Sequence, residues 1–336
     1  MKINRLLLFV PLMALASCFK EDEKIIPYDR GEKIKAAIAM TQTYKYQVYY
    51  SLADSQVVSS NLKTGFDLLF SNDPGGAGIY LNTSNFSQAA ATGKYNLDEV
   101  MAATGLNYTY DASSGNPDSV VFKNWITFEG ADTIWPGEVY VIDRGYDDLG
   151  TVLGYRKIIF DSLSGNRYYF RFSNLNGSGL QSAVVEKTGQ SNYLYFSFDE
   201  GLQLFPEPPK TAYDLLFTQY TTLLFTNEGE PYPYLVTGVL LNRFATQAYL
   251  DTTLAFDSIT SEHIQDELFT SRPDLIGYDW KEVLGDVNTG NVYYEIRPEN
   301  NYFLKDQQGF YYKLRFISFY NNAGEKGYPT FEFQRL

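Results

Sequence analysis

Apolar and polar residues alternate with a period of two along many short segments of this chain. In Arg167–Phe172 the apolar residues fall on one face and the two arginines on the other, and Phe310–Phe319 repeats the pattern with Lys313 and Arg315 on its polar face. This alternation is typical of antiparallel strands with one side in water. Turn-forming stretches such as Asn72–Gly76 are frequent between them. We therefore predict a mainly β fold built of antiparallel sheets.

Helical periodicity is confined to three short segments. They are Ile34–Thr43, Asn96–Ala103 and Ser261–Phe269, and in the last of them Ile264 and Leu268 share one face. We expect a few short helices there, each accessory to the sheets.

A series of short blocks occurs twice in the same order, which indicates one module written twice. The clearest block is Thr64–Ser71, TGFDLLFS, which returns as Thr211–Thr218, TAYDLLFT. The other matched blocks are Tyr49–Leu52 with Tyr195–Phe198, Gly78–Asn82 with Gly238–Asn242, Gly137–Arg144 with Gly290–Arg297, and Arg167–Asn174 with Tyr311–Ser318. We predict two tandem antiparallel β modules, at residues 36–180 and 181–336, joined in the Gly/Ser/Asn-rich stretch Leu175–Gly189.

The repeated blocks consist of strands and turns, so we interpret them as scaffold. Asp67 and Asp214 interrupt the same apolar strand in both copies, and burying an acid there requires backbone hydrogen bonds. We assign both a structural role. The inserts that differ between the copies contain Met101 and His263, and we place candidate ligand chemistry there.

The first residues form a separate targeting segment. Lys2 and Arg5 precede the apolar run Leu6–Ala16, which is too short to span a bilayer and predicts a signal peptide at residues 1–17. The run ends in Leu-Ala-Ser before Cys18, which resembles the lipobox of bacterial lipoproteins. That resemblance implies cleavage before Cys18 and its acylation, and hence attachment to a membrane without spanning it. The alternative is an ordinary secreted protein with a chance cysteine.

We predict a lipidated flexible tether at residues 18–35. The acidic cluster after Cys18 resembles the surface-export signal of Bacteroidetes lipoproteins, and the alternative is a solvated spacer. We expect an outer-membrane lipoprotein exposed at the cell surface. Because Cys18 is the only cysteine, no disulfide can form within the chain.

Charge and composition exclude some partners. The formal net charge is −13, and loss of Lys2 and Arg5 would make it −15. A field of this sign repels phosphate backbones, so we expect no nucleic-acid partner. The aromatic content of 17% is interpreted first as sheet-forming residues.

The combination of these motifs resembles a family. A lipobox, then YFSF, Tyr-Asp-Leu-Leu-Phe, Gly-x-x-x-Asn, a late Trp and a Gly-x-Val-Tyr strand are followed by the closing segment from Tyr311 to Phe333. This order is similar to the HmuY family of Bacteroidetes surface lipoproteins, whose best-known members act as haemophores. The resemblance implies a mainly β fold, haem as the ligand and an outer-membrane uptake receptor as partner. It covers both copies.

The resemblance also implies a pair of axial side chains for haem, histidines in the type case. His263 is the only histidine, so a bis-histidine site within one chain is excluded by counting. A Met/His pair is known in haem proteins, which makes Met101 and His263 the candidate ligands. The alternative is that His263 is a solvated surface residue and Met101 fills a core.

No sequence signature of catalysis stands out. The chain has no free thiol other than Cys18, no second histidine, and no Gly-x-Ser-x-Gly, HExxH or phosphate-loop motif. We expect a protein that is not an enzyme and holds no dedicated metal site. Its predicted function is capture of haem or another small hydrophobic ligand. The alternative is a glycan-binding or protein-interaction surface lipoprotein without a role for haem.

Overall fold

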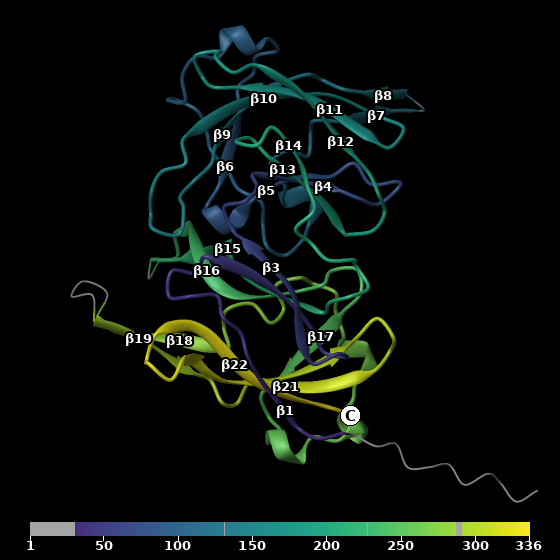
Figure 1. The fold of residues 1–336 in the computed structure, drawn as a ribbon, viewed down its shortest axis with the longest axis vertical. Coiled ribbons are helices and arrows are strands. Elements are labelled where there is room, and N and C mark those ends of the chain that lie inside the picture. The colour runs from purple at the N-terminus through teal and green to yellow at the C-terminus, as the bar shows by residue number, and fades with distance from the viewer. Residues whose placement is uncertain (1–30, 131, 227, 287–290) are drawn as a thin grey trace, which may run out of the picture. The chain divides into compact units, whose positions relative to one another are not determined.

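The structure is a computed structural model that describes residues 31–130, 132–226, 228–286 and 291–336 (Figure 1). The predicted signal peptide, Cys18 and the tether up to residue 30 lie outside these residues. Gly31–Leu336 forms one compact unit. Among the described helices, none has the length and apolar character that a membrane crossing requires.

The mainly β prediction is confirmed: the described chain folds into antiparallel sheets. The first five-stranded sheet has the order β12 (Gln181–Glu186), β11 (Arg167–Ser173), β10 (Tyr155–Ser164), β9 (Val139–Asp143), β6 (Gln88–Ala91). The first four-stranded sheet has the order β14 (Leu202–Leu204), β13 (Tyr193–Ser197), β4 (Leu68–Ser71), β5 (Ile79–Leu81). The second four-stranded sheet has the order β16 (Pro231–Leu241), β15 (Leu215–Phe225), β2 (Tyr46–Ser51), β3 (Gln56–Leu62). The second five-stranded sheet has the order β1 (Ile34–Ala37), β22 (Lys326–Arg335), β21 (Tyr311–Tyr320), β20 (Asn301–Lys305), β17 (Gln247–Asp251).

Two hairpins and six single-turn 3-10 helices complete the described elements. The hairpins are β7 (Thr127–Glu129) with β8 (Asp132–Ile134), and β18 (Lys281–Asp286) with β19 (Asn291–Ile296). The helices are η1 (Thr83–Asn85), η2 (Leu97–Glu99), η3 (Pro117–Ser119), η4 (Phe256–Ser258), η5 (Ser261–His263) and η6 (Asp266–Leu268).

The helix predicted at Ile34–Thr43 is wrong. Ile34–Ala37 is strand β1 and pairs with β22, with Ile34 opposite Phe333. Its alternating burial is that of an edge strand, because pairing with β22 outweighs the weak helical preference of a short segment. The segments at 96–103 and 261–269 hold only the single turns of η2, η5 and η6.

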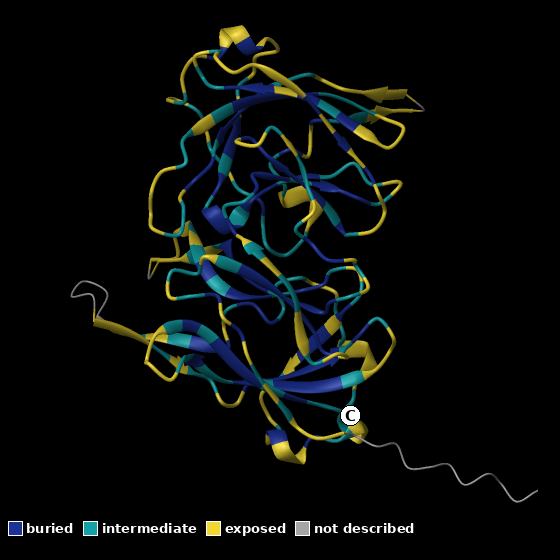
Figure 2. Cartoon of the chain, viewed as in Figure 1, coloured by how far each residue is buried: buried dark blue, intermediate teal, exposed yellow. Residues whose placement is uncertain are grey.

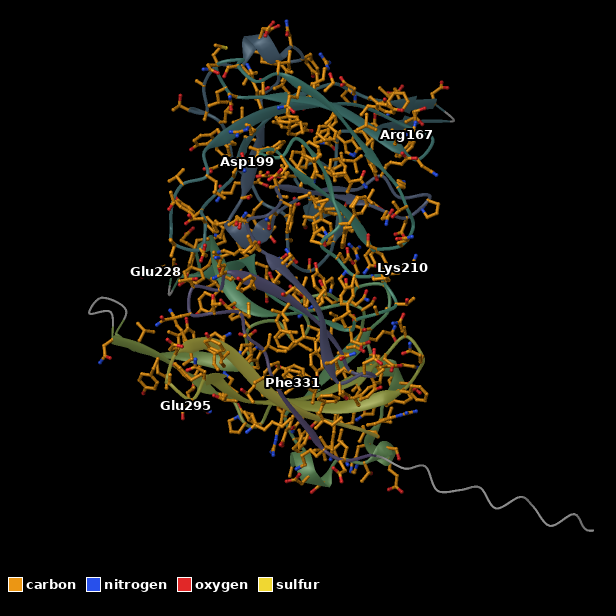
Figure 3. All side chains as sticks on the ribbon, viewed as in Figure 1. Arg167, Asp199, Lys210, Glu228, Glu295 and Phe331 are labelled. Carbon is orange, nitrogen blue, oxygen red and sulfur yellow. The ribbon has the colours of Figure 1, made fainter. Side chains whose placement is uncertain are left out.

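Each five-stranded sheet packs on a four-stranded sheet to form a sandwich with its own core. The first core joins β4, β5 and β13 to β9–β12 through residues such as Phe70, Phe170 and Phe196. The second joins β2, β15 and β16 to β20–β22, and Phe331 from β22 lies at its centre (Figure 3). Figure 2 shows the buried residues gathered within these sheets. The two sandwiches stack so that their four-stranded sheets face one another (Figure 1).

The two sandwiches divide the chain differently from the predicted boundary at 180/181. Strands β1–β3 belong to the second sandwich through β1–β22 and β2–β15 pairing. The segment Leu175–Gly189, predicted to be a linker, contains β12, which pairs with β11. The first sandwich is therefore one continuous stretch, β4 to β14, set between the two parts of the second. That the chain arose by duplication stays a prediction.

The order of strands is the same in both sandwiches, and it corrects part of the block matching. Read along the sheets, β4 corresponds to β15, as the TGFDLLFS and TAYDLLFT blocks predict. In contrast, β9 corresponds to β20 and β10 to β21. The block Gly137–Arg144 was matched to a block on β19 and the block Arg167–Asn174 to one on β21, so neither match joins equivalent strands. A block can be matched to the wrong strand because neighbouring aromatic strands share the same period-two alternation and therefore have similar sequences.

Buried polar residues support this correspondence. Lys157 on β10 donates from Nζ to the carbonyls of Leu97 and Val100, at 2.8 and 2.9 Å. Lys313 on β21 donates in the same way to Phe256 and Ile259, at 2.9 and 3.1 Å. The polar face predicted to meet water at Lys313 is therefore covered by η4, and the lysine holds that turn against the sheet.

The two aspartates of the repeated block act as the sequence predicts. Asp67 accepts a hydrogen bond from the backbone N–H of Phe198, and Asp214 accepts one from Leu52, both at 2.7 Å. Each carboxylate thus holds the end of a neighbouring strand within its own sandwich, β13 or β2.

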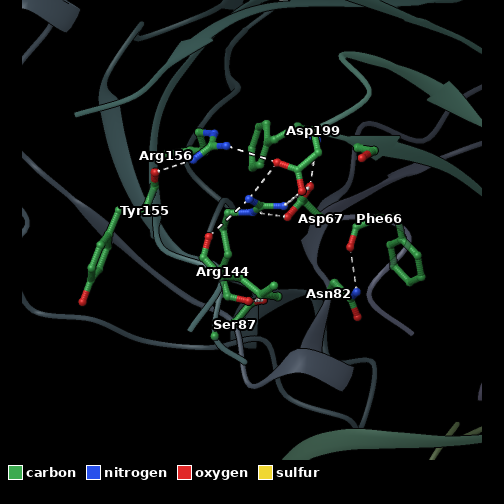
Figure 4. Close-up of polar contacts among 12 residues, drawn as sticks. Phe66, Asp67, Asn82, Ser87, Arg144, Tyr155, Arg156 and Asp199 are labelled. Carbon is green, nitrogen blue, oxygen red and sulfur yellow. Dashed lines mark hydrogen bonds and ion pairs between the residues drawn. The ribbon is translucent and has the colours of Figure 1, made fainter. Parts of the chain in front are cut away.

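Asp67 has a partner that Asp214 lacks. The Nε of Arg144 lies 2.6 Å from Asp67 Oδ1, and its Nη2 lies 2.7 Å from Asp199 Oδ2 (Figure 4). Asp214 receives the hydroxyl of Thr246 at 3.2 Å instead, and burial raises its pKa to about 6. The first sandwich therefore contains a buried ion pair at the position where the second has a carboxylate without a cationic partner among the described residues.

Replacement of Arg144 tests how much this ion pair stabilises the fold. Arg144→Met leaves Asp67 buried without its countercharge, so we expect the free energy of unfolding to fall by about 3–5 kcal/mol. Urea unfolding measures the change. The matched control is Arg171→Met on β11, whose exposed pair with Asp161 is expected to contribute less than about 1 kcal/mol. Equal small losses in both variants would contradict a stabilising role for Arg144.

Candidate functional site: a cavity between the four-stranded sheets

The two four-stranded sheets line a half-open cavity where their outer faces meet. Its volume is about 170 Å³, and its lining includes Leu69, Tyr80, Tyr193, Leu216, Tyr220 and Arg243. Beside it the hydroxyls of Tyr49 and Tyr195 lie 3.3 Å apart and join β2 of one sandwich to β13 of the other. We call this layer of contacts between the two four-stranded sheets the seam.

The repeated Asp-Leu-Leu-Phe block builds two walls of the cavity. Side chains alternate across a strand, so Leu68 and Phe70 enter the first core while Leu69 faces the cavity. On β15, Leu215 enters the second core while Leu216 faces the cavity. The repeated blocks are therefore more than scaffold. The inserts also line the cavity, through residues such as Ser113 and Arg243, but Met101 and His263 are not among its lining residues.

The sequence contained a signal for this cavity that the scaffold interpretation missed. Apolar residues occupy both faces of the block, so the strand must be covered on both sides. Such continuous apolar character predicts a second packing partner beyond the core.

Glu207 is the buried acid that holds the seam together. Its side chain accepts hydrogen bonds from the hydroxyls of Tyr213 at 2.8 Å and Tyr195 at 3.2 Å, and from the backbone N–H groups of Asn192 and Tyr193. Burial raises the pKa of Glu207 and raises the pKa values of both tyrosines well above their usual range. The tyrosines are therefore neutral hydrogen-bond donors at physiological pH.

Two loops close the cavity from one side. Ser113 donates its hydroxyl to Asp274 Oδ2 at 2.7 Å, which joins a loop of the first sandwich to a loop of the second. A Cβ at Gly115 would lie 3.1 Å from Pro273 and 3.3 Å from the guanidinium carbon of Arg243. The close approach of these loops favours glycine at this position, where φ is +72°.

The structure does not bring Met101 and His263 together. Met101 is 58% exposed, with its sulfur 3.9 Å from Lys157 Nζ on β10. His263 ends η5 and lies beside Tyr249 on β17, whose hydroxyl donates to the His263 carbonyl. The turns that precede them, η2 and η4, pack on different five-stranded sheets and lie at opposite ends of the unit in Figure 1.

The hydrogen bonding of His263 does not prepare it for iron. Its Nδ1 accepts the backbone N–H of Thr260 at 3.1 Å, so the proton of the neutral imidazole lies on Nε2. A metal-ligating histidine ordinarily donates from one ring nitrogen and ligates with the other. Among the described residues, no group of three or more His, Cys, Asp and Glu side chains is placed to hold a metal ion.

The cavity residues do not fit a haem. Sites for drug-sized ligands typically measure about 300–1,000 Å³, well above the ≈ 170 Å³ enclosed here. Tyrosine can ligate haem iron, but burial raises the pKa values of Tyr80, Tyr193 and Tyr220 and so disfavours the phenolate form. A compact ligand suits the enclosed space better.

The fold and the cavity define a mainly β protein of two stacked sandwiches with a small, half-open cavity between them. The chain belongs to the HmuY protein family, whose sequence profile matches residues 43–333. The family resemblance seen in the sequence is thereby confirmed. A comparison with curated proteins finds no significant match.

Several solved structures are similar to this chain at low identity. Apo PinO of Porphyromonas gingivitis is 9% identical, with 91% of this chain and 98% of that chain covered and a TM-score of 0.26. The apo HmuY analog (TFO) of Tannerella forsythia is 10% identical, with 92% and 98% covered and a TM-score of 0.24. A Bacteroides vulgatus protein described as HmuY-like and heme-binding is 16% identical, with 53% and 90% covered and a TM-score of 0.19. Because these scores are low, the family assignment rests on the profile.

Asp111 makes the stability of the cavity wall depend on pH. It accepts the N–H groups of Leu81 and Val121, both at 2.7 Å, and burial raises its pKa to about 7. The folded state therefore holds a proton that the unfolded state loses above about pH 4. We expect stability to fall as the pH rises from about 4 to 7, by up to about 1.4 kcal/mol per pH unit from this group.

Urea unfolding at several pH values between 4 and 8 measures this dependence. In Asp111→Asn the contribution of this carboxyl disappears, so the slope of stability against pH should become less negative between pH 4 and 7. Glu129→Gln, at an exposed acid of β7, serves as the control. An unchanged slope in Asp111→Asn would show that Asp111 is ionised in the folded state.

Proposed function

We propose that this protein is a surface-anchored binding lipoprotein of the HmuY type that captures haem or another small hydrophobic ligand without catalysis. The observation that carries the proposal is the aromatic and aliphatic cavity in the seam of a HmuY-family fold. Apolar walls with a few polar groups are the usual composition of small-molecule sites. The enclosed volume favours the smaller ligand over haem.

Capture at equilibrium requires only that the ligand exchange water for these walls. Leu69 and Leu216 supply apolar surface from the two sandwiches, and the rings of Tyr80 and Tyr193, with centroids 5.6 Å apart, supply a rigid aromatic wall. Burial of apolar surface contributes roughly 25 cal/mol per Å². The Ser113–Asp274 contact provides a closure that can separate to admit the ligand.

The membrane attachment in this proposal rests on the sequence before the described unit. Cys18, in its lipobox-like context, would carry the lipid. Residues 19–33, which precede β1, would hold the binding unit away from the membrane, so the tether ends before the predicted residue 35. An outer-membrane uptake receptor would be the partner that receives the ligand.

A second function is favoured by exposed aromatic residues on two hairpins. Phe225, Tyr232 and Tyr234 of β15–β16 and Tyr293 of β18–β19 are exposed. Exposed aromatic side chains are common where proteins meet partners or stack on sugars. A glycan-binding or protein-interaction role would use these hairpins and leave the cavity without a ligand.

A haemin titration of Gly31–Leu336 tests whether haem is the captured ligand. We expect that any saturable shift of the Soret band survives His263→Ala, because Nδ1 of His263 is engaged by Thr260. Glu262→Ala, an exposed residue on the same turn, is the control. A low-spin spectrum lost only in His263→Ala would contradict this expectation and establish His263 as an axial ligand. Absence of a saturable shift would exclude haem as the captured ligand and would leave the smaller hydrophobic ligand as the proposal.

The anchor is tested by Cys18→Ser. Loss of the acylated cysteine removes the hydrophobic attachment, so we expect the protein to leave the membrane fraction almost completely. Fractionation of the producing cells, with immunoblotting, measures the distribution. Ser17→Ala, which keeps the cysteine and a small residue before it, is the control. Membrane retention of the Cys18→Ser variant would contradict lipid anchoring.

A further inference from the structure

The cavity contains a positive charge that forms no ion pair with a carboxylate in the part of the chain that the structure describes. Arg243 follows β16, lines the cavity and lies with its guanidinium carbon 5.4 Å from the ring centroid of Phe244. None of the salt bridges among the described residues involves Arg243. Asp111 also lines the cavity, but its two oxygens are engaged by backbone N–H groups. A half-buried guanidinium of this kind favours an anion, ideally a carboxylate that meets its paired donors.

The cavity also contains a buried acceptor to which no described residue donates. Asn192 is 3% exposed, and its Nδ2 donates to Tyr213 at 3.0 Å and to Asn242 Oδ1 at 2.8 Å. The amide orientation is determined by Asn242, whose own Nδ2 donates to two carbonyls. Asn192 Oδ1 therefore has no partner among the described residues. An unpaired buried acceptor destabilises the folded state, so a ligand that donates to it gains affinity.

The space between these two polar groups is apolar and small. Leu69 from β4 and Leu216 from β15 are both partly exposed to it from opposite sheets. The volume of about 170 Å³ suits a single ring rather than a fused or macrocyclic system.

We propose that this cavity binds a compact amphipathic carboxylic acid. Its carboxylate lies at Arg243, its ring lies between Leu69 and Leu216, and a hydroxyl or N–H group on it donates to Asn192 Oδ1. This inference rests on the proposed capture function and names the chemical class of the ligand.

Calorimetric titration of Gly31–Leu336, the compact unit, with three related probes tests the assignment. The probes are 4-hydroxyphenylacetate, phenylacetate without the ring hydroxyl, and 2-(4-hydroxyphenyl)ethanol without the carboxylate. We expect 4-hydroxyphenylacetate to bind most tightly. Loss of the charge-assisted contact should weaken binding of the alcohol by about 10- to 100-fold, and loss of the hydroxyl should weaken phenylacetate by about tenfold.

Variants separate the charge from the shape of the cavity. Arg243→Gln should abolish the preference for the acid over the alcohol, whereas Arg167→Gln, the same charge change at an exposed position of β11, should leave it unchanged. Leu216→Trp should fill the cavity and remove binding of all three probes. Circular dichroism of each variant confirms that the fold persists.

Two results would overturn the assignment: equal affinity for the acid and the alcohol, or an affinity for the acid that Arg243→Gln does not change. Haemin binding without binding of any probe would leave the proposed capture function intact and refute this inference. Probe binding without haemin binding would support this inference and would also support capture of a small ligand other than haem. Binding of neither would refute both.

Discussion

The seam between the two four-stranded sheets is the constraint on which the rest of this structure depends. Each of these sheets is covered on both faces, by a sandwich core on one side and by the other sandwich on the opposite side. The strands at their centres therefore contain apolar residues at consecutive positions, as in Asp-Leu-Leu-Phe. Glu207 and the tyrosine hydroxyls satisfy the polar groups that this double burial would otherwise leave unpaired. The cavity is the part of the seam that side chains do not fill.

Much of the fold could be predicted from the sequence because strand alternation is a local property. Arg167–Phe172 alternates in the structure as it does in the sequence, and the repeated Asp67 and Asp214 bind backbone N–H groups as burial requires. The helix at Ile34–Thr43 was wrong because the partner that makes Ile34–Ala37 a strand, β22, lies at the other end of the chain. No local pattern contains that information. The nested division of the chain escaped prediction for the same reason, since β1–β3 are assigned only by β2–β15 and β1–β22 pairing.

The candidate site was harder to predict than the fold. Searching for haem ligands directs attention to His263 and Met101, which are rare residue types, yet the turns that precede them pack on different five-stranded sheets. The residues that line the cavity are common ones, and their meeting depends on how two sheets stack. Arg243 and Asn192 carry no motif that marks them. Only the structure shows that, among the described residues, Arg243 has no carboxylate partner and the Oδ1 of Asn192 has no donor. Membership of the HmuY family thus indicates the architecture, while the size and polarity of the cavity limit the chemical class of ligand that fits.

The central claim is that Glu207 and the tyrosines of the seam hold both sandwiches as one unit. Hydrogen exchange of the backbone amides in the unaltered chain and in Glu207→Gln tests it most directly. The substitution places an amide N–H₂ group opposite the donors that Glu207 now accepts. The account predicts faster exchange in both four-stranded sheets together, in β2 and β15 as well as in β13 and β4. Faster exchange confined to the start of β13, with β2 and β15 unchanged, would contradict it.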